Sequence, residues 1–196
     1  MANTVKAIPE GSEGATPYLS VKGAADAIEF YKKAFGARET MRMAGPDGRI
    51  GHAEITIGKA HIMLADEHPE IDFLSPTTLG GSPVTIHIYV EDVDALAVQA
   101  EAAGARITRA VADQFYGDRA GVFKDPFGHV WHFATHKEDV SNEELQKRAA
   151  ALASGGKPCA SPRGLPYRHP VPDRYGRSGG LKDPFGLDWW VCSQDE

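Results

Sequence analysis

The sequence predicts an α+β fold made of two β-α-β-β-β modules, followed by a C-terminal helix and a hairpin-like tail. Two similar strand segments, Tyr18-Leu-Ser-Val-Lys-Gly and His87-Ile-Tyr-Val-Glu-Asp, lie about seventy residues apart, and each precedes an apolar helical stripe. Each helical stretch ends at a Gly-Ala pair, where a left-handed glycine commonly closes a helix. Three strand-like segments separated by turn residues follow each helix. The repeat spacing fits a duplicated small module rather than a solenoid.

Module one contains the first helix and three of the predicted strands. The helix is expected over 24–35, because Ala27, Ile28, Tyr31, Ala34 and Phe35 recur at helical spacing. Strands are then expected over 38–44, 51–57 and 60–65, with turns at 45–48 and 58–59.

Module two repeats this order. A strand over 84–90 leads to a helix over 93–103, which Asp92 is suited to cap. Strands are expected over 106–112, 121–124 and 129–135, the last two joined by the turn Asp125-Pro-Phe-Gly128. Residues 67–82 form a connector between the modules that contains Pro and Gly.

The C-terminal part has two further features. Ser141 and Glu144 form a capping box that opens a helix to about Ala153. The stretch from Tyr175 to Trp190 repeats most of Tyr116–Trp131, which predicts a second copy of the closing hairpin. Such a hairpin is expected to pack on a sheet edge, across a dimer for example, or to be poorly ordered. We divide the chain into a leader (1–13), module one (14–80), module two (81–138), a helix (139–156) and a tail (157–196).

Composition excludes several classes of protein. A net charge of −6 argues against a nucleic-acid surface. No stretch approaches the ~20 apolar residues of a membrane helix, and the first fourteen residues lack the apolar core of a signal peptide. The two cysteines, Cys159 and Cys192, form no C-x-x-C pair. We therefore expect a soluble cytoplasmic protein that binds neither nucleic acid nor membrane.

The motifs resemble those of the vicinal oxygen chelate (glyoxalase/bleomycin resistance/dioxygenase) superfamily. The resemblance rests on the duplicated modules, the helix end Phe30-Tyr-Lys-Lys-Ala-Phe-Gly-Ala37 and the closing Asp125-Pro-Phe-Gly-His-Val-Trp131. Tyr116-Gly-Asp-Arg119 before this turn is most similar to the PhnB-like subgroup. The resemblance covers roughly residues 16–139 and implies an open eight-stranded barrel around a cavity. We also expect a homodimer.

Strand alternation predicts which side chains face that cavity. Trp131, Phe133 and the isoleucines of the strands are expected to pack under the helices. His129 is read as part of the turn, His136 as solvent-exposed and His61 as a surface residue. Tyr116 and Arg119 are expected near the cavity mouth, where an aromatic ring and a guanidinium could hold a planar or anionic ligand; a turn-stabilising pair of Asp118 with Arg119 is the alternative. The predicted ligand-binding residues are His52, Glu54, Met63, His87, Tyr116, Arg119 and His132.

A metal site is an alternative for the same face. In metal-dependent relatives the ligands lie on the first and last strands of each module, positions that the resemblance carries to Thr16, Met63, Thr85 and His132. Only His132 among them is a usual ligand, so we expect no cofactor. A rearranged site for Zn, Ni, Mn or Fe would use His52, Glu54, His87 and His132.

Three functions follow from these alternatives. The first is metal-independent binding of a small molecule in the cavity. The second is a metal-dependent lyase, isomerase or dioxygenase in which Glu54 and His132 are the catalytic candidates. The third is a non-catalytic dimeric scaffold whose tail mediates assembly.

Overall fold

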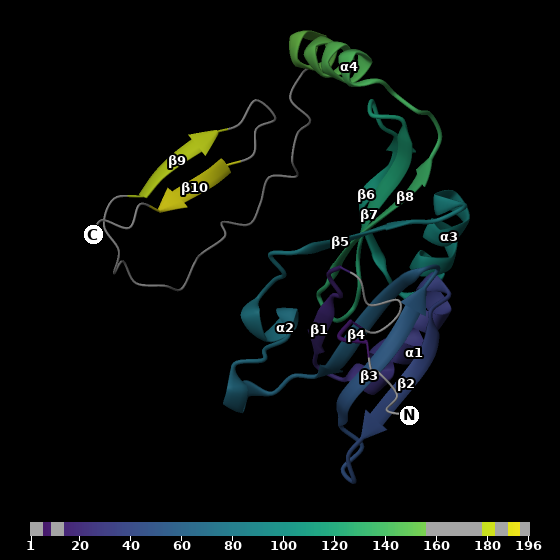
Figure 1. The fold of residues 1–196 in the computed structure, drawn as a ribbon, viewed down its shortest axis with the longest axis vertical. Helices are drawn as coiled ribbons and strands as arrows, with labels where there is room; N and C mark the ends of the chain where they lie inside the picture. The colour runs from purple at the N-terminus through teal and green to yellow at the C-terminus, as the bar shows by residue number, and fades with distance from the viewer. Residues whose placement is uncertain (1–5, 9–13, 156–177, 183–187, 193–196) are drawn as a thin grey trace. The chain divides into compact units, whose positions relative to one another are not determined.

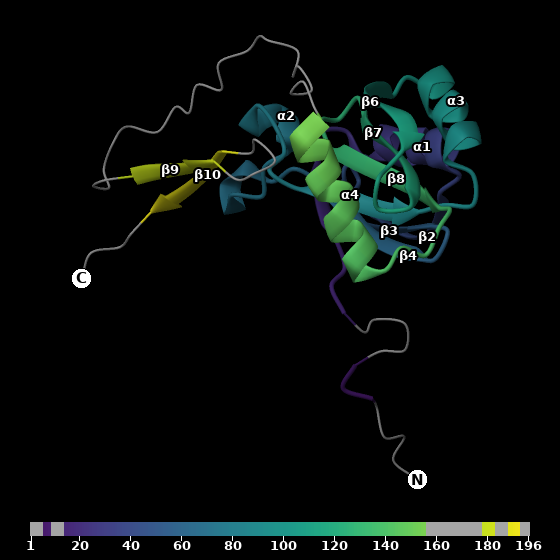
Figure 2. The same ribbon diagram turned by 90° about the horizontal axis from the view of Figure 1, so that it is seen from above.

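The computed structural model describes residues 6–8, 14–155, 178–182 and 188–192. The chain divides into two compact units, Met1–Asp139 and Val140–Glu196. The first unit contains two four-stranded sheets with helices, an α+β arrangement (Figures 1 and 2). None of the helices in these described residues is both long enough and apolar enough to span a membrane.

Sheet one is formed by module one. Its elements are β1 (Tyr18–Val21), α1 (Ala24–Phe35), β2 (Arg38–Ala44), β3 (Ile50–Ile57) and β4 (Ala60–Asp66). The strand order is β1-β4-β3-β2, with β1 parallel to β4 and the other pairs antiparallel. The Asp66 carboxylate accepts hydrogen bonds from the backbone N–H groups of Gly23, Ala24 and Ile50, so it ties the start of α1 to two strands.

Sheet two is formed by module two in the same topology. Its elements are β5 (Thr85–Tyr89), α3 (Val93–Ala103), β6 (Arg106–Asp113), β7 (Asp118–Lys124) and β8 (Val130–His136). The order β5-β8-β7-β6 repeats that of sheet one and confirms the duplicated β-α-β-β-β pattern. Strand β7 begins at Asp118 instead of the expected 121, because Asp118 and Arg119 already pair with His136 and Thr135 of β8.

The two sheets are separate. Among the described residues, no strand of sheet one is hydrogen-bonded to a strand of sheet two, so the eight strands do not form one closed barrel. The connector contains a 3-10 helix, η1 (Pro69–Ile71), and a short helix, α2 (Pro76–Leu79), neither of which was expected. The Ser75 hydroxyl caps α2 by accepting from the Thr78 N–H, and Pro76 occupies its first turn.

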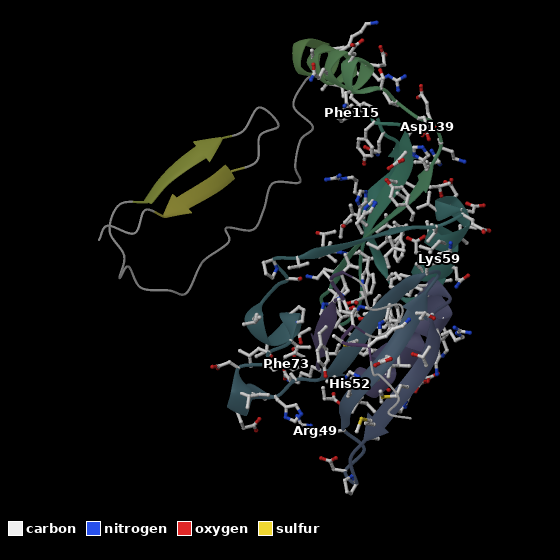
Figure 3. All side chains as sticks on the ribbon, in the orientation of Figure 1. Arg49, His52, Lys59, Phe73, Phe115 and Asp139 are labelled. Atoms are coloured by element: carbon white, nitrogen blue, oxygen red, sulfur yellow. The ribbon has the colours of Figure 1, made fainter. Side chains whose placement is uncertain are left out.

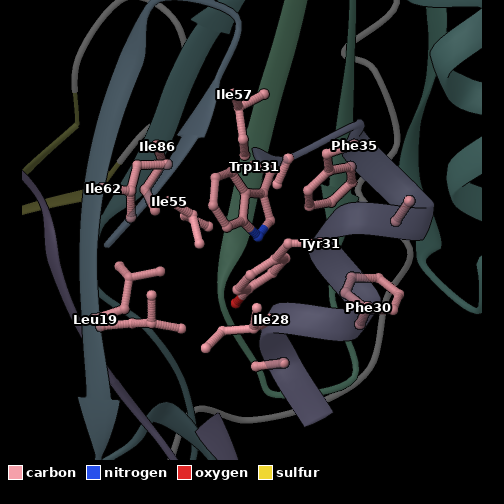
Figure 4. Packing of buried hydrophobic residues seen from close by; sticks show 14 of the residues in the cluster. Leu19, Ile28, Phe30, Tyr31, Phe35, Ile55, Ile57, Ile62, Ile86 and Trp131 are labelled. Atoms are coloured by element: carbon pink, nitrogen blue, oxygen red, sulfur yellow. The ribbon is translucent and has the colours of Figure 1, made fainter. Parts of the chain in front are cut away.

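One hydrophobic core joins the modules. Helix α1 of module one packs against α3 of module two, and the Trp131 ring of β8 lies against Tyr31 and Phe35 of α1 (Figure 4). Trp131 and Phe133 are fully buried, as alternation predicted, and so are the inward side chains Ile55, Ile57, Ile62 and Leu64. Because the core belongs to both modules, they are expected to unfold together.

A buried carboxylate reinforces this junction. Asp125 Oδ2 accepts hydrogen bonds from the Tyr31 hydroxyl (2.8 Å) and Trp131 Nε1 (2.9 Å). Its Oδ1 accepts from the backbone N–H groups of Phe127 and His129. Asp125 is only 4% exposed, and all four bonds together satisfy the carboxylate. The Asp-Pro-Phe-Gly turn is therefore an anchor between the modules as well as a strand connection.

The second unit contains helix α4 (Asn142–Gly155) and a two-stranded sheet. Ser141 Oγ accepts from the Glu144 N–H, which confirms the predicted start of the helix. Strands β9 (Ser178–Lys182) and β10 (Asp188–Cys192) pair antiparallel with Lys182 opposite Asp188. This matches Lys124 opposite Val130 in module two, so the predicted second hairpin is present in the same register. The repeated turn at 183–186 and the residues 156–177 lie outside the described part of the chain.

Candidate functional site

Each sheet has one face turned away from α1, α3 and the core, and we call it the open face. On sheet one it carries Tyr18, Met41, Met43, His52, Glu54, His61 and Met63; on sheet two it carries His87, Tyr89, Arg109, Val122 and His132. These faces contain most of the predicted site residues. Several of their side chains are strongly exposed, including Met43 at 60% and Tyr89 at 55%.

A hydrogen-bonded chain crosses the open face of sheet one. His52 and His61 each place Nε2 near one oxygen of Glu54, at 3.3 and 3.1 Å. Since a carboxylate only accepts, both Nε2 atoms carry a proton, and His52 Nδ1 forms a hydrogen bond with the Tyr18 hydroxyl (2.9 Å). The bond from His52 is the main cause that lowers the pKa of Glu54, although desolvation opposes it. Figure 3 marks His52 and Phe73 in this region, where the rings of both contact Tyr18.

An imidazole pair occupies the open face of sheet two. His87 and His132 are directly opposite each other on β5 and β8, and their Nδ1 atoms are 2.8 Å apart. One ring must donate and the other accept, so this bond requires at least one neutral ring. Burial lowers the pKa of His132, and the positive charges of His87 and Arg109 lower it further. The pair was predicted as two separate ligand-binding residues, and the structure brings them into contact.

A second network lies at the end of β8. The Tyr89 hydroxyl donates to Asp118 Oδ2 (2.7 Å), and His136 Nδ1 donates to Asp118 Oδ1 (2.8 Å). His136 Nε2 donates in turn to Asp139. Both its partners are carboxylates, which only accept, and the bond to Asp118 raises the pKa of His136. The expected exposure of His136 is confirmed, but its ring is anchored.

Arg119 is engaged in ion pairs. Its Nη2 and Nε donate to both oxygens of Asp94 (2.7 and 2.6 Å), and Nη1 donates to Asp113. The expected alternative, a pair with Asp118, is wrong, since Asp118 bonds to Tyr89 and His136. The bidentate pair fixes α3 to the start of β7. Tyr116 is half-buried in the turn before β7; burial and the negative charge of Asp118 raise its pKa, and the positive charge of Arg109 opposes this shift.

The residues do not fit the divalent metal site of the metal-dependent relatives. Strand register places Tyr18 opposite Met63 and His87 opposite His132, so the positions carried to Thr16 and Thr85 are two residues too early. A phenol and a thioether are poor ligands for such ions. The alternative set is split between two sheets, and no three His, Cys, Asp or Glu side chains of the described residues gather in metal-binding geometry.

A cleft of about 620 Å³ lies between β1, β5 and the connector. This volume is within the range of small-molecule sites. Its lining is mainly apolar, with the Tyr18, Ser20 and His87 side chains among its polar groups; the lining residues are Ala15–Ser20, Asp72–Leu74, Pro76, Leu79, Gly81–His87 and His129.

The connector wall of the cleft is held by specific bonds. Glu67 Oε2 accepts from the Ser75 N–H, the Ser75 hydroxyl (2.7 Å) and the Thr78 hydroxyl (2.6 Å). The Ser20 hydroxyl of β1 donates to the Phe73 carbonyl. Gly128, in the turn between β7 and β8, packs closely against Pro76 of the connector: its φ is 95°, and a Cβ added there would lie 3.0 Å from Pro76 Cβ. These contacts position the wall before any ligand arrives.

Sequence reasoning missed several residues of this site. His129 does close the Asp125–Gly128 turn through its backbone bonds to Asp125, but its side chain was missed: it is 6% exposed and its Nε2 donates to the Ser20 carbonyl of β1. His61 is half-buried and bound to Glu54 instead of free on the surface. Tyr18 could have been found, because it starts the strand opposite Met63 and alternates with buried Leu19. Phe73 carried no signal, since it belongs to an aperiodic connector.

Comparison with known proteins gives consistent results. A family model described as the Glyoxalase/Bleomycin resistance protein/Dioxygenase superfamily matches residues 15–133. The uncharacterized protein Rv0887c of Mycobacterium tuberculosis is 46% identical over 144 residues, which cover 72% of this chain and 83% of that protein. The structure of the Arabidopsis thaliana protein At5g48480 matches with a TM-score of 0.51 and 28% identity over 62% of this chain and 97% of that one. TioX from Micromonospora sp. ML1 shares the fold, with a TM-score of 0.52 and 23% identity over 66% of this chain and 100% of its own.

Proposed function

The chain belongs to the glyoxalase/bleomycin resistance protein/dioxygenase superfamily, and from this premise we propose that it binds a small molecule in the cleft between β1 and β5 without a metal. We assign it to the PhnB-like subgroup on the Tyr116-Gly-Asp-Arg119 motif before the Asp125–Gly128 turn. The observation that carries the proposal is the cleft itself: about 620 Å³ with a mainly apolar lining and a few polar groups.

The lining suggests how a ligand is held. Leu19, Phe73 and Leu74 offer apolar surface to the body of the ligand. The Tyr18 hydroxyl and the His87 ring lie at the border with the two open faces, where they can bond to polar groups. The Tyr18 hydroxyl is already oriented by His52, which reduces the entropy lost on binding.

Binding of the neutral dye N-phenyl-1-naphthylamine tests the proposal. Val84 lines the cleft and is 63% exposed, so Val84→Trp should fill the cleft and weaken dye binding at least tenfold. Val98 of α3 is 73% exposed and outside the cleft lining, which makes Val98→Trp the matched control with unchanged affinity. A wild-type protein that binds neither this dye nor any member of a compound library in a thermal-shift screen would refute the proposal.

We further propose that a second copy of the chain covers the open face of sheet one. Support comes from the exposed Met41 and Met43 of β2, since exposed apolar patches often mark interfaces. Sedimentation velocity should then show a dimer that Met43→Glu dissociates and Val98→Glu does not. A wild-type monomer at micromolar concentration would contradict the proposal. If the tail mediates assembly, as in the scaffold function, truncation after Gly156 should also dissociate the dimer.

Metal-dependent lyase or dioxygenase chemistry has less support, because Glu54 already accepts from His52 and His61 and no three ligands converge in the described residues. Metal analysis after incubation of untagged protein with excess Zn, Ni, Mn or Fe distinguishes the two functions. One bound ion per chain, lost in His132→Ala, would favour the metal-dependent function and overturn ours.

A further inference from the structure

We propose that Arg109, together with the His87–His132 pair, binds an anionic group of the ligand, such as a carboxylate, sulfonate or phosphate. The inference deepens the proposed small-molecule binding and rests on it. It assigns to Arg109 the role that sequence analysis gave to Arg119.

Strand register places these groups in one row across sheet two. His87 of β5 is opposite His132 of β8, His132 is opposite Val122 of β7, and Val122 is opposite Arg109 of β6. Directly opposite residues of neighbouring strands point to the same face of a sheet. All four therefore lie on the open face, opposite the buried Phe123 and Trp131. His87 also lines the cleft, so the row continues from it.

Arg109 is available for a ligand. Its side chain is exposed, and no carboxylate of the described residues forms an ion pair with it. Arg119 of the same module, by contrast, is held by Asp94 and Asp113. An arginine recognises carboxylate, sulfonate or phosphate through parallel N–H donors, which requires a guanidinium without an internal partner.

The imidazole pair adds a donor to the same face. The bond between the two Nδ1 atoms makes one ring the acceptor, and that ring carries its proton on Nε2 when it is neutral. This Nε2–H has no partner among the described residues and can donate to an anion. The nearby Asp118 carboxylate does not compete strongly, because it is buried and accepts from Tyr89 and His136.

The test compares two dyes that differ mainly in charge. 8-Anilinonaphthalene-1-sulfonate carries a sulfonate, whereas N-phenyl-1-naphthylamine is the neutral counterpart. Wild-type protein should bind the sulfonate more tightly, and Arg109→Gln should weaken that binding roughly tenfold or more while leaving the neutral dye unchanged. Arg38→Gln removes the same charge from an exposed site on β2 and is the control, with both affinities unchanged. Near-UV circular dichroism and sedimentation of each variant verify the fold and the oligomeric state.

Three results would overturn the inference. If Arg109→Gln binds both dyes like wild type, the cleft takes small molecules without an anion subsite, and the proposed function stands alone. If neither dye binds the wild-type protein, the proposed function fails as well. If Arg109→Gln dissociates a dimer, Arg109 belongs to a contact between copies of the chain.

Discussion

Replacing Tyr31 by Phe isolates the bond that joins the two modules at Asp125. The substitution removes one oxygen atom from a fully buried ring and leaves the ring contacts with Phe35 and Trp131 in place. The lost interaction is the 2.8 Å bond to Asp125 Oδ2, which then retains only Trp131 Nε1 as a donor.

The expected cost follows from the burial of both partners. A hydrogen bond to a charged group contributes about 1.5–3 kcal/mol, and no cavity term is added because only a hydroxyl is removed. We expect Tyr31→Phe to lower the free energy of unfolding by about 2 kcal/mol, or Tm by roughly 8 °C for a domain of this size. Asp125→Asn should cost more, about 3 kcal/mol, because its amide N–H₂ must face two of the four N–H or O–H donors.

Urea unfolding followed by Trp131 fluorescence measures both changes. The other two tryptophans, Trp189 and Trp190, lie in the tail, so a Trp189→Phe/Trp190→Phe background makes Trp131 the single reporter. Tyr116→Phe is the matched control, because the structure gives its hydroxyl no hydrogen bond to another described side chain. A Tyr31→Phe protein as stable as this control, within 0.5 kcal/mol, would refute the reasoning.

Three further predictions concern the cleft wall and the histidines. The Thr78 and Ser75 hydroxyls lower the pKa of Glu67 to about 2, so the stability that ionised Glu67 contributes is present above pH 4.5 and lost as the pH falls toward 2. Glu67→Gln should therefore lower the free energy of unfolding by about 1 kcal/mol at pH 7 and leave it unchanged near pH 2, as measured by urea unfolding. Gly128→Ala should cost about 1–3 kcal/mol by thermal unfolding, because of its positive φ and the contact with Pro76; unchanged stability would contradict this. In an NMR titration His136 should titrate above pH 6.5 and His132 below it, since hydrogen bonding to Asp118 raises the first pKa and burial lowers the second. The stability that His136 contributes is present at low pH and is lost as the pH rises through its raised pKa. A His132 that titrates at higher pH than His136 would contradict the hydrogen bond between His136 and Asp118 and the burial of His132.

Periodic features made most of the fold predictable. The expected bounds of α1 and α3 agree with the structure, and those of β2 do as well, because apolar spacing, glycine caps and turn residues all point to the same elements. Even the tail hairpin follows from its repeated motif. The connector was not predicted, because η1 and α2 are short and aperiodic, and the bonds that hold this segment run to Glu67 and from Ser20 of β1.

The sequence predicted which sheet face carries the site residues, but not which residues those side chains bond to. Alternation placed His52, Glu54, His87 and His132 on the open faces, because side chains along a strand point to opposite sides in turn. Whether Arg109 or Arg119 forms an ion pair with a carboxylate depends on contacts between segments that are far apart in the sequence. Arg119 lies 25 positions after Asp94, and only the packing of α3 beside β7 brings the two together. The His129 contact with β1 spans 109 positions, so it depends on how the modules dock.

The matching topology of the modules has a consequence for what they can recognise. Equivalent strand positions hold Tyr18, Met63 and Glu54 in one half, and His87, His132 and Val122 in the other. The two halves therefore share strand order and register but differ in chemistry, since one face carries the Glu54 carboxylate and the other the Arg109 guanidinium. A ligand that contacted both faces would therefore meet unlike groups at its two ends and bind in one direction, whereas a ligand with identical ends would have no preferred direction.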